Sequence, residues 1–273
     1  DVVRVGVLAI RSAVAANAQY GPLVSYLEET LKRPFELVPL DQEAQFTEVA
    51  QNNLQFTFNN PLAGEQLRRL YQTEFLATLS RANTETEFSG LIIVRPDSGI
   101  NTISDLTGKH GACVAFQTAA AGCVFQIFHL QQNGIDPFTD FASFIEIPSQ
   151  DNIIFGVLNG TFDVGFVRTG QLEKMVTEGT ILSINELTIL DRAEDDFFYP
   201  HTTRLYPEWP FAALVNTNPE LKEEVRVALL ALTPEHPAMV AANANTFVPA
   251  IDYTAIDELI EALQLRSWDS SEQ

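Results

Sequence analysis

Arg168 and Thr169 stand where a strand-like run, residues 162–167, gives way to a helix-like segment. Ligands of open α/β sheets bind at the carboxyl ends of strands, beside the loops that lead into helices. A guanidinium in that place can hold an oxyanion through two parallel hydrogen bonds, and a threonine hydroxyl can add another. A surface salt bridge is the other role that this position allows Arg168, and the sequence leaves both open.

A second corner of the chain is built from small residues, between strand-like residues 111–116 and helix-like residues 119–133. Its members are Gln117, Thr118, Ala119, Ala120 and Ala121. The start of a helix carries unpaired N–H donors and about half a positive charge, which suits phosphate, sulfate or carboxylate. Small side chains let a ligand approach such a backbone closely. The alternative is a plain, tightly packed corner.

Two asparagines and a tyrosine occupy comparable places earlier in the chain. Asn59 and Asn60 follow a strand-like run and precede Pro61, a residue that is comfortable in the first turn of a helix. Their amides can contact polar ligand atoms, although capping the helix is the commoner use. Tyr20 precedes a Gly-Pro pair at the expected start of the first helix, where it can contact a ligand or fill the core.

The chain has two cysteines, Cys113 and Cys123, one on each side of the small-residue corner. A strand and the helix that follows it pack together, so the two thiols can face each other. A disulfide requires Cα atoms about 4.4–6.8 Å apart. Three interpretations remain open: a bridge that stiffens the corner, a redox-sensing pair, and two small buried apolar residues.

The sequence offers little for catalysis or for metal binding. The four histidines are His110, His129, His201 and His236, and none has a metal-binding spacing. Nucleophile-elbow, P-loop and dinucleotide glycine motifs are absent from the sequence. We therefore expect no catalytic residue, no metal and no cofactor. The alternative from another class is a two-lobed enzyme, for which Cys123 is the one candidate thiol nucleophile.

Composition limits the partners. The chain has 273 residues, 46% of them hydrophobic, with 36 acidic against 16 basic residues and a net charge of -20. Such a field repels nucleic acid and anionic lipid, so neither is expected as a main partner. No apolar run reaches the length of about 18 residues that a membrane-spanning helix needs, and the sequence opens on a strand-like run instead of a basic, apolar leader.

Strand-like and helix-like runs alternate along the chain. This alternation predicts an α/β architecture with largely parallel sheets. The strand-like runs are residues 2–10, 35–40, 54–58, 75–79, 90–94, 111–116, 143–147, 162–167 and 211–215. The helix-like runs are residues 22–31, 46–52, 119–133, 152–159, 170–178, 219–232 and 254–263, with one more that begins at Pro61.

Six stretches, in order, resemble the phosphonate-binding-protein-like family of periplasmic binding proteins. They are residues 20–31, 35–40, 59–61, 103–109, 133–137 and 158–165, and the resemblance covers nearly the whole chain. It implies the type II periplasmic binding fold, in which two α/β lobes joined by two hinge crossovers close on a ligand. Lobe 1 is then residues 1–86 plus 202–273, and lobe 2 is residues 87–201.

Four further stretches resemble a branch of that family found on two-component histidine kinases, which includes tetrathionate and thiosulfate sensors. They are residues 166–173, 203–211, 236–238 and 252–265. This resemblance implies a non-catalytic, extracytoplasmic sensor domain, anchored in the full-length protein by a C-terminal transmembrane segment and able to form a homodimer there. The alternative is a free periplasmic carrier for a phosphonate- or oxyanion-type ABC importer.

The fold implied by the resemblance brings the candidate residues to one cleft. The second lobe would supply Gln117, Thr118, Arg168 and Thr169 with the N–H groups of Ala119 and Ala120; the first would supply Tyr20, Asn59 and Asn60, with Tyr206 near the hinge. Phosphonate binders carry a serine- and threonine-rich corner where this chain has alanines. Each lost hydrogen bond to a charged group costs about 1.5–3 kcal/mol. We therefore expect a less highly charged ligand than phosphonate, or an oxyanion held mainly by Arg168 and the backbone.

Overall fold

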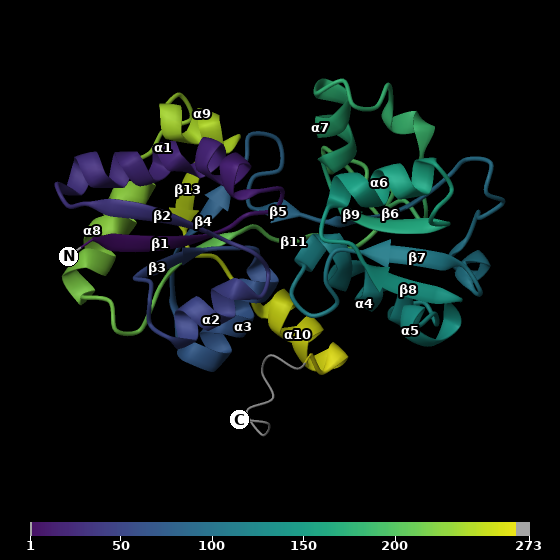
Figure 1. The fold of residues 1–273 in the computed structure, drawn as a ribbon, viewed down its shortest axis with the longest axis horizontal. Coiled ribbons are helices and arrows are strands. Elements are labelled where there is room, and N and C mark those ends of the chain that lie inside the picture. The colour runs from purple at the N-terminus through teal and green to yellow at the C-terminus, as the bar shows by residue number, and fades with distance from the viewer. Residues whose placement is uncertain (1, 266–273) are drawn as a thin grey trace. The chain divides into compact units, whose positions relative to one another are not determined.

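The computed structural model describes residues 2–265, which form two compact units (Figure 1). The first unit combines Asp1–Glu87 with Pro207–Gln273, and the second is Phe88–Tyr206. Figure 1 shows the purple and blue N-terminal elements of the first unit alongside its yellow-green C-terminal elements. The first unit is therefore assembled from both ends of the chain.

The chain returns from the second unit to the first between Tyr206 and Pro207, five residues beyond the expected boundary at 201/202. Residues 202–206 stay with the second unit because Thr202 and Thr203 both donate their N–H groups to Gly90 O, at 3.0 and 3.1 Å. The two crossings lie in the short strands β5 (Glu87–Phe88) and β11 (Tyr206–Pro207), which form a two-stranded sheet.

The first unit contains a six-stranded sheet in the order β13-β4-β12-β3-β1-β2. Its strands are β1 (Val3–Leu8), β2 (Phe35–Leu40), β3 (Phe56–Phe58), β4 (Glu74–Ser80), β12 (Pro210–Ala213) and β13 (Thr246–Pro249). The strand β1 is parallel to β2 and β3, whereas β12 is antiparallel to β3 and β4, and β13 is antiparallel to β4.

The first helix is longer than the sequence pattern indicates. The helix α1 (Ala13–Leu31) begins after Ser12, whose side chain accepts the Ala15 N–H, and it runs through Pro22. We expected the helix to begin at Pro22, and that start is wrong because the alanine-rich turns before the proline favour a helix strongly. The Ala18 carbonyl, which a proline at this position cannot bond, lies on an exposed residue and can bond to water.

Three of the remaining helices of the first unit, α3, α8 and α9, begin with a side-chain cap. Asn60 and Asn218 accept N–H groups from the first turns of α3 and α8, each of which has proline at its first position. The helices of this unit after α1 are α2 (Ala44–Ala50), α3 (Pro61–Tyr71), α8 (Pro219–Leu230), α9 (Pro237–Ala242) and α10 (Thr254–Leu263).

The second unit contains a five-stranded sheet in the order β10-β6-β9-β7-β8. Its strands are β6 (Gly90–Val94), β7 (His110–Cys113), β8 (Ser143–Glu146), β9 (Val164–Arg168) and β10 (Thr188–Ile189). Its helices are α4 (Phe125–Gln132), α5 (Pro137–Asp140), α6 (Gln150–Leu158) and α7 (Gln171–Thr177), and a π-helical turn, Ala120–Val124, precedes α4.

Both sheets are mixed, so the expectation of largely parallel sheets is wrong in part. In the second unit β7 is parallel to β8 and β9, but β6 is antiparallel to β9 and β10 is antiparallel to β6. The strands β6 and β12 each follow a crossing between units. Because no crossover helix of the same unit precedes them, nothing forces them to run parallel to their neighbours.

The helices that the structure describes differ from membrane-spanning helices in length or in polarity. Within residues 2–265, no helix combines the length and the apolar character that crossing a bilayer requires. The longest helix, α1, has 19 residues, but it carries exposed polar side chains along its length.

Candidate ligand site

The small-residue corner of the second unit forms the π-helical turn that leads into α4. The Val124 N–H donates to Ala119 O at 2.9 Å, which closes the first wide turn, and the Ala119 N–H itself donates to Ala115 O at 3.3 Å. Thr118, Ala119 and Ala120 are buried. Because the Ala119 N–H is used within the corner, the unpaired donors expected at a helix start are those that follow Ala119.

A disulfide joins the two ends of this corner. Cys113 at the end of β7 and Cys123 in the π-helical turn are bridged, with their Cα atoms 4.9 Å apart and both side chains fully buried. The Val114 N–H donates to Gly122 O at 2.9 Å beside the bridge. A Cβ on Gly122 would lie 2.8 Å from the Val114 side chain, so this close contact requires glycine. Of the three interpretations of the cysteines, the structure shows the bridge.

Gln126 is a positioning residue that the sequence analysis missed. Its side chain is fully buried, and the two protons of its Nε2 are shared among Ala121 O, Leu91 O and Val167 O, which lie 2.7, 3.1 and 3.0 Å away. One amide thus fastens the small-residue corner to β6 and to β9, next to Arg168. The signal in the sequence was a lone glutamine between Phe125 and Ile127, on the buried face of an apolar helix.

Arg168 and Thr169 lie at the carboxyl end of β9, as the sequence pattern indicates. The Arg168 N–H donates to Gln150 Oε1 at 2.8 Å, and its guanidinium lies 5.6 Å from the centre of the Phe88 ring. Thr169 is buried and exchanges two bonds with Ser89: its Oγ1 accepts the Ser89 N–H, and its own N–H donates to Ser89 O. Thr169 thus holds the start of β6 against β9, and Arg168 is half-buried beside it.

Tyr206 is enclosed by other rings and by a cation. It is buried, its ring stacks on Phe125 with centroids 3.8 Å apart, and the Arg204 guanidinium lies over it at 5.4 Å. The structure therefore uses the Tyr206 ring for packing. Gln117, the first residue of the small-residue corner, is half-buried, and Glu146 accepts the N–H of the preceding Phe116 at 2.6 Å.

In the first unit, the two asparagines have different roles. Asn60 caps α3, since its Oδ1 accepts the Ala63 N–H at 3.0 Å, and its Nδ2 lies 3.4 Å from Gln42 Oε1. Asn59 Oδ1 accepts the Asn60 N–H at 2.8 Å, but its buried Nδ2 has no hydrogen-bond partner among the described residues. An unpaired buried donor is costly, so Asn59 is the side chain of this unit best prepared to receive an acceptor from a ligand.

Tyr20 lies in the middle of α1, not at its start, and it is buried among aromatic rings. Its ring meets Phe58 edge-on at 5.2 Å and lies 6.3 Å from the Trp209 ring. The neighbouring Arg81 Nε donates to Glu208 Oε1 at 2.7 Å, and Glu208 is fully buried. Burial lowers the pKa of Arg81, but Glu208 and Tyr20 more than offset this effect, so the net pKa is raised and Arg81 stays charged.

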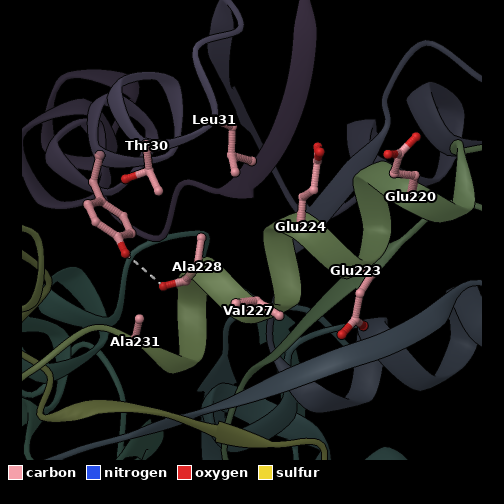
Figure 2. Close-up of a pocket in the computed structure, with 9 residues that line it drawn as sticks. Thr30, Leu31, Glu220, Glu223, Glu224, Val227, Ala228 and Ala231 are labelled. Atoms are coloured by element: carbon pink, nitrogen blue, oxygen red, sulfur yellow. Dashed lines mark hydrogen bonds between the residues drawn. The ribbon is translucent and has the colours of Figure 1, made fainter.

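A groove elsewhere in the first unit is not suited to an anion. It has a volume of about 550 Å³ and lies between α1 and α8, where Figure 2 shows three glutamates along α8 together with apolar side chains of the same helix and Leu31. Tyr26 lines it and donates its hydroxyl proton to Ala228 O at 2.9 Å. The glutamates are Glu220, Glu223 and Glu224. Their negative charge would repel an anion, whereas the candidate site presents the Arg168 guanidinium and backbone donors, which attract one.

The described residues hold no group of three or more histidine, cysteine and carboxylate side chains that could bind a metal ion. Among the predicted site residues, the second unit brings together the Ala119–Ala121 corner, Arg168 and Thr169 through Gln126 and Ser89. The first unit brings Asn59 and Asn60 together at the start of α3. The first unit thus offers amide donors, and the second offers backbone donors and the Arg168 guanidinium, a set suited to holding an anion.

Comparison with known proteins identifies the family of the chain. Residues 5–254 match a family model described as the periplasmic substrate-binding protein of a phosphonate ABC transporter. The chain is 30% identical over 233 residues to the tetrathionate sensor histidine kinase TtrS of Salmonella typhimurium, a match that covers 82% of this chain and 38% of that protein.

Solved structures share the fold. PhnD1 from Prochlorococcus marinus, in complex with methylphosphonate, matches with a TM-score of 0.79 at 17% identity, over 96% of this chain and 98% of its own. The Xanthomonas citri protein XAC2383, bound to ATP, matches with a TM-score of 0.78 at 19% identity, over 98% of each chain. At these identities the likeness establishes the type II periplasmic binding fold.

Proposed function

Because this chain belongs to the family of periplasmic substrate-binding proteins of phosphonate ABC transporters, we propose that it is the anion-sensing domain of a two-component histidine kinase. The family places a ligand-binding domain of this type outside the cytoplasm. The domain itself performs no chemistry in this proposal; the kinase activity, the membrane anchor and dimerisation belong to the longer protein of which it would be a part.

The observation that carries the sensor role is the match to TtrS. Identity is 30% over most of this chain, whereas PhnD1 and XAC2383, which share the fold, are 17% and 19% identical. The chain corresponds to 38% of the length of TtrS. A sensing domain attached to further domains accounts for that proportion, and the activity of the whole protein is part of the proposal.

The ligand would be a small oxyanion held by donors of both units. The second unit offers the Arg168 guanidinium, the hydroxyls of Thr118 and Thr169, the Gln117 amide and the backbone donors of the corner. The first unit offers the Asn59 amide. Asn60 donates its N–H to Asn59 Oδ1, and the Tyr20 ring packs against the preceding Phe58. A ligand that contacts both units favours the conformation in which both sets of contacts are made, and this population shift would be the signal.

Calorimetric titration with anionic probes tests the anion site. Replacing Arg168 by alanine should weaken binding of the anion by about 10- to 100-fold, because a hydrogen-bonded charge pair contributes about 1.5–3 kcal/mol. Arg192→Ala is the matched control, since Arg192 is an exposed arginine of the same unit and its loss changes the net charge equally. Unchanged affinity in Arg168→Ala would remove Arg168 from the site.

The family match itself favours a second candidate, a free carrier for an ABC importer. The two functions differ in what the bound domain acts on. In full-length protein reconstituted in membranes, a sensor should change its autophosphorylation when the anion is added. A carrier has no kinase to regulate, and should instead stimulate ATP hydrolysis by a cognate transporter.

A further inference from the structure

Two arginines of the second unit flank the same short piece of chain. In the antiparallel pairing of β6 with β9, Arg168 lies opposite Gly90. On the other edge of β6, Gly90 O accepts the Thr203 N–H at 3.1 Å, and Arg204 follows directly. Ser89 binds both neighbours: its carbonyl accepts the Thr169 N–H, and its Oγ donates to Thr203 O at 2.7 Å.

The two arginines therefore stand on opposite sides of one strand. Successive residues of a strand direct their backbone bonds to alternate sides, and here Ser89 bonds toward β9 while Gly90 bonds toward Thr203. Arg168 and Arg204 are therefore attached to chain segments that bond to the two edges of the same residues, Ser89 and Gly90. Two long side chains placed in this way can reach two ends of one small molecule.

A shared cluster of rings orients both guanidiniums. Arg168 lies over Phe88 at 5.6 Å and Arg204 lies over Tyr206 at 5.4 Å. Phe125 connects the two rings, since it meets Phe88 edge-on at 5.5 Å and stacks on Tyr206 at 3.8 Å. All three rings are buried and fixed. The Arg168 Nε also donates to Thr169 O at 3.3 Å, which fixes the plane of that guanidinium further. A guanidinium stacked on a ring directs its N–H groups sideways, in its own plane, toward hydrogen-bond acceptors such as oxyanions.

We propose that the ligand carries two separated anionic groups and that Arg204 binds the second of them while Arg168 binds the first. This inference rests on the proposed function and narrows its ligand class to small anions with two charged ends. Only 16 basic residues oppose 36 acidic ones in this chain, so a doubly charged ligand needs two local cations to overcome the surrounding field. The alanines of the corner would then face the uncharged middle of the ligand.

Calorimetry with four probes tests this pairing. Tetrathionate carries a charged group at each end, whereas sulfate, thiosulfate and methylphosphonate carry their charge on a single head. Arg204→Ala should weaken tetrathionate binding by about 10- to 100-fold, as loss of one charged pair predicts, and should change the affinity for any single-headed anion that binds by less than about threefold. Arg168→Ala should weaken binding of both kinds.

Two controls make the result specific. Arg204→Lys keeps the positive charge but loses the planar guanidinium, which can donate two parallel hydrogen bonds. Its affinity for tetrathionate should lie between those of the wild type and Arg204→Ala. Arg192→Ala removes an exposed arginine of the same unit and should bind tetrathionate like the wild type. Circular dichroism melting of each variant identifies any loss of binding that follows from unfolding.

The outcomes separate this inference from the function on which it rests. If Arg168→Ala weakens binding while Arg204→Ala does not, or if only single-headed anions bind the wild type, the two-ended ligand is wrong and the anion-sensing domain stands. If Arg204→Ala lowers the affinity for tetrathionate and for single-headed anions equally, the inference is also overturned. If the wild type binds none of the four probes at millimolar concentration, the anion-binding function and this inference fail together.

Discussion

At the scale of single residues, the two asparagines show how the structure separates roles that the sequence left open. Both were candidates for ligand contact and for capping. Asn60 performs the capping role, because its Oδ1 accepts the Ala63 N–H. Asn59 retains a buried amide donor with no partner among the described residues. Adjacent, identical side chains therefore predict different consequences when each is replaced.

Replacing Asn60 by alanine should cost about 1 kcal/mol of unfolding free energy, the usual effect of losing an N-cap. Asn60→Ser should retain most of that stability because serine caps equally well. Neither change should alter anion affinity beyond its effect on folding. Urea unfolding and calorimetry of the same preparations measure both quantities. A large loss of affinity in a stable Asn60→Ser variant would show that Asn60 contacts the ligand directly.

Gln126 gives the second prediction at this scale. Truncating it to alanine removes the two amide protons shared among three carbonyls of the corner, β6 and β9, and leaves a small cavity, so we expect a loss of roughly 1–3 kcal/mol in unfolding free energy. Gln131→Ala is the matched control: it lies on the same helix, is exposed, and should change the stability by less than about 0.5 kcal/mol. Urea denaturation of the two variants makes the comparison, and equal stabilities would contradict the fastening role.

At the scale of elements, the disulfide joins the strand β7 to the turn that precedes α4. The bridge closes a loop of ten residues, which should contribute roughly 3 kcal/mol by restricting the unfolded chain. A Cys113→Ala, Cys123→Ala double variant should therefore melt at a lower temperature than the oxidised wild type. Reductant should lower the melting temperature of the wild type and leave that of the double variant unchanged.

The helices α3 and α10 are joined by a charged cluster that responds to pH. Arg69 binds Asp257 at 2.6 Å, and Arg68 binds Glu65, whose side chain is 1% exposed. Burial, assisted by a hydrogen bond with Asp257 and only partly opposed by Arg68, raises the pKa of Glu65 from 4.5 to about 7. The folded state therefore holds this proton more tightly than the unfolded chain does.

Stability should fall as that proton is lost. A raised carboxyl pKa contributes stability that is present below the unfolded value of 4.5 and disappears as the pH rises through about 7. The unfolding free energy of the wild type, relative to that of Glu65→Gln, should drop between pH 5 and pH 8 by an amount on the order of 1–3 kcal/mol. Urea unfolding at the two pH values measures this difference. A constant difference would mean that Glu65 titrates normally.

At the scale of the whole molecule, the sequence predicted the α/β architecture and the family, and it placed Arg168 and the small-residue corner at strand ends. It could not predict the antiparallel strands β6 and β12, because their direction depends on where the chain crosses between the units. It missed Gln126, Arg81 and Glu208 because their partners are remote in the sequence. The sequence analysis also placed the start of α1 at Pro22, because proline favours the first turn of a helix. The helix propensity of the alanine-rich residues before Pro22 was given too little weight.

The net charge of -20 leads to a prediction about the rate of anion binding. At long range an approaching anion meets the repulsive field of the whole molecule, and close to the site it meets the local guanidiniums. Raising the ionic strength from 0.01 to 0.15 M shortens the Debye length from about 30 to about 8 Å. The added salt should screen the distant repulsion more than the contacts in the site.

The association rate constant for tetrathionate should therefore rise with added salt, the reverse of ordinary electrostatic steering. The dissociation rate constant should rise as well, though less steeply, because the charge pairs within the site are close and partly buried. Stopped-flow titration at several salt concentrations measures both constants. Arg168→Ala should make the rise in association steeper, since it removes a local attraction that opposes the long-range field. An association rate that falls with salt would show that the site's cations dominate the field even at a distance.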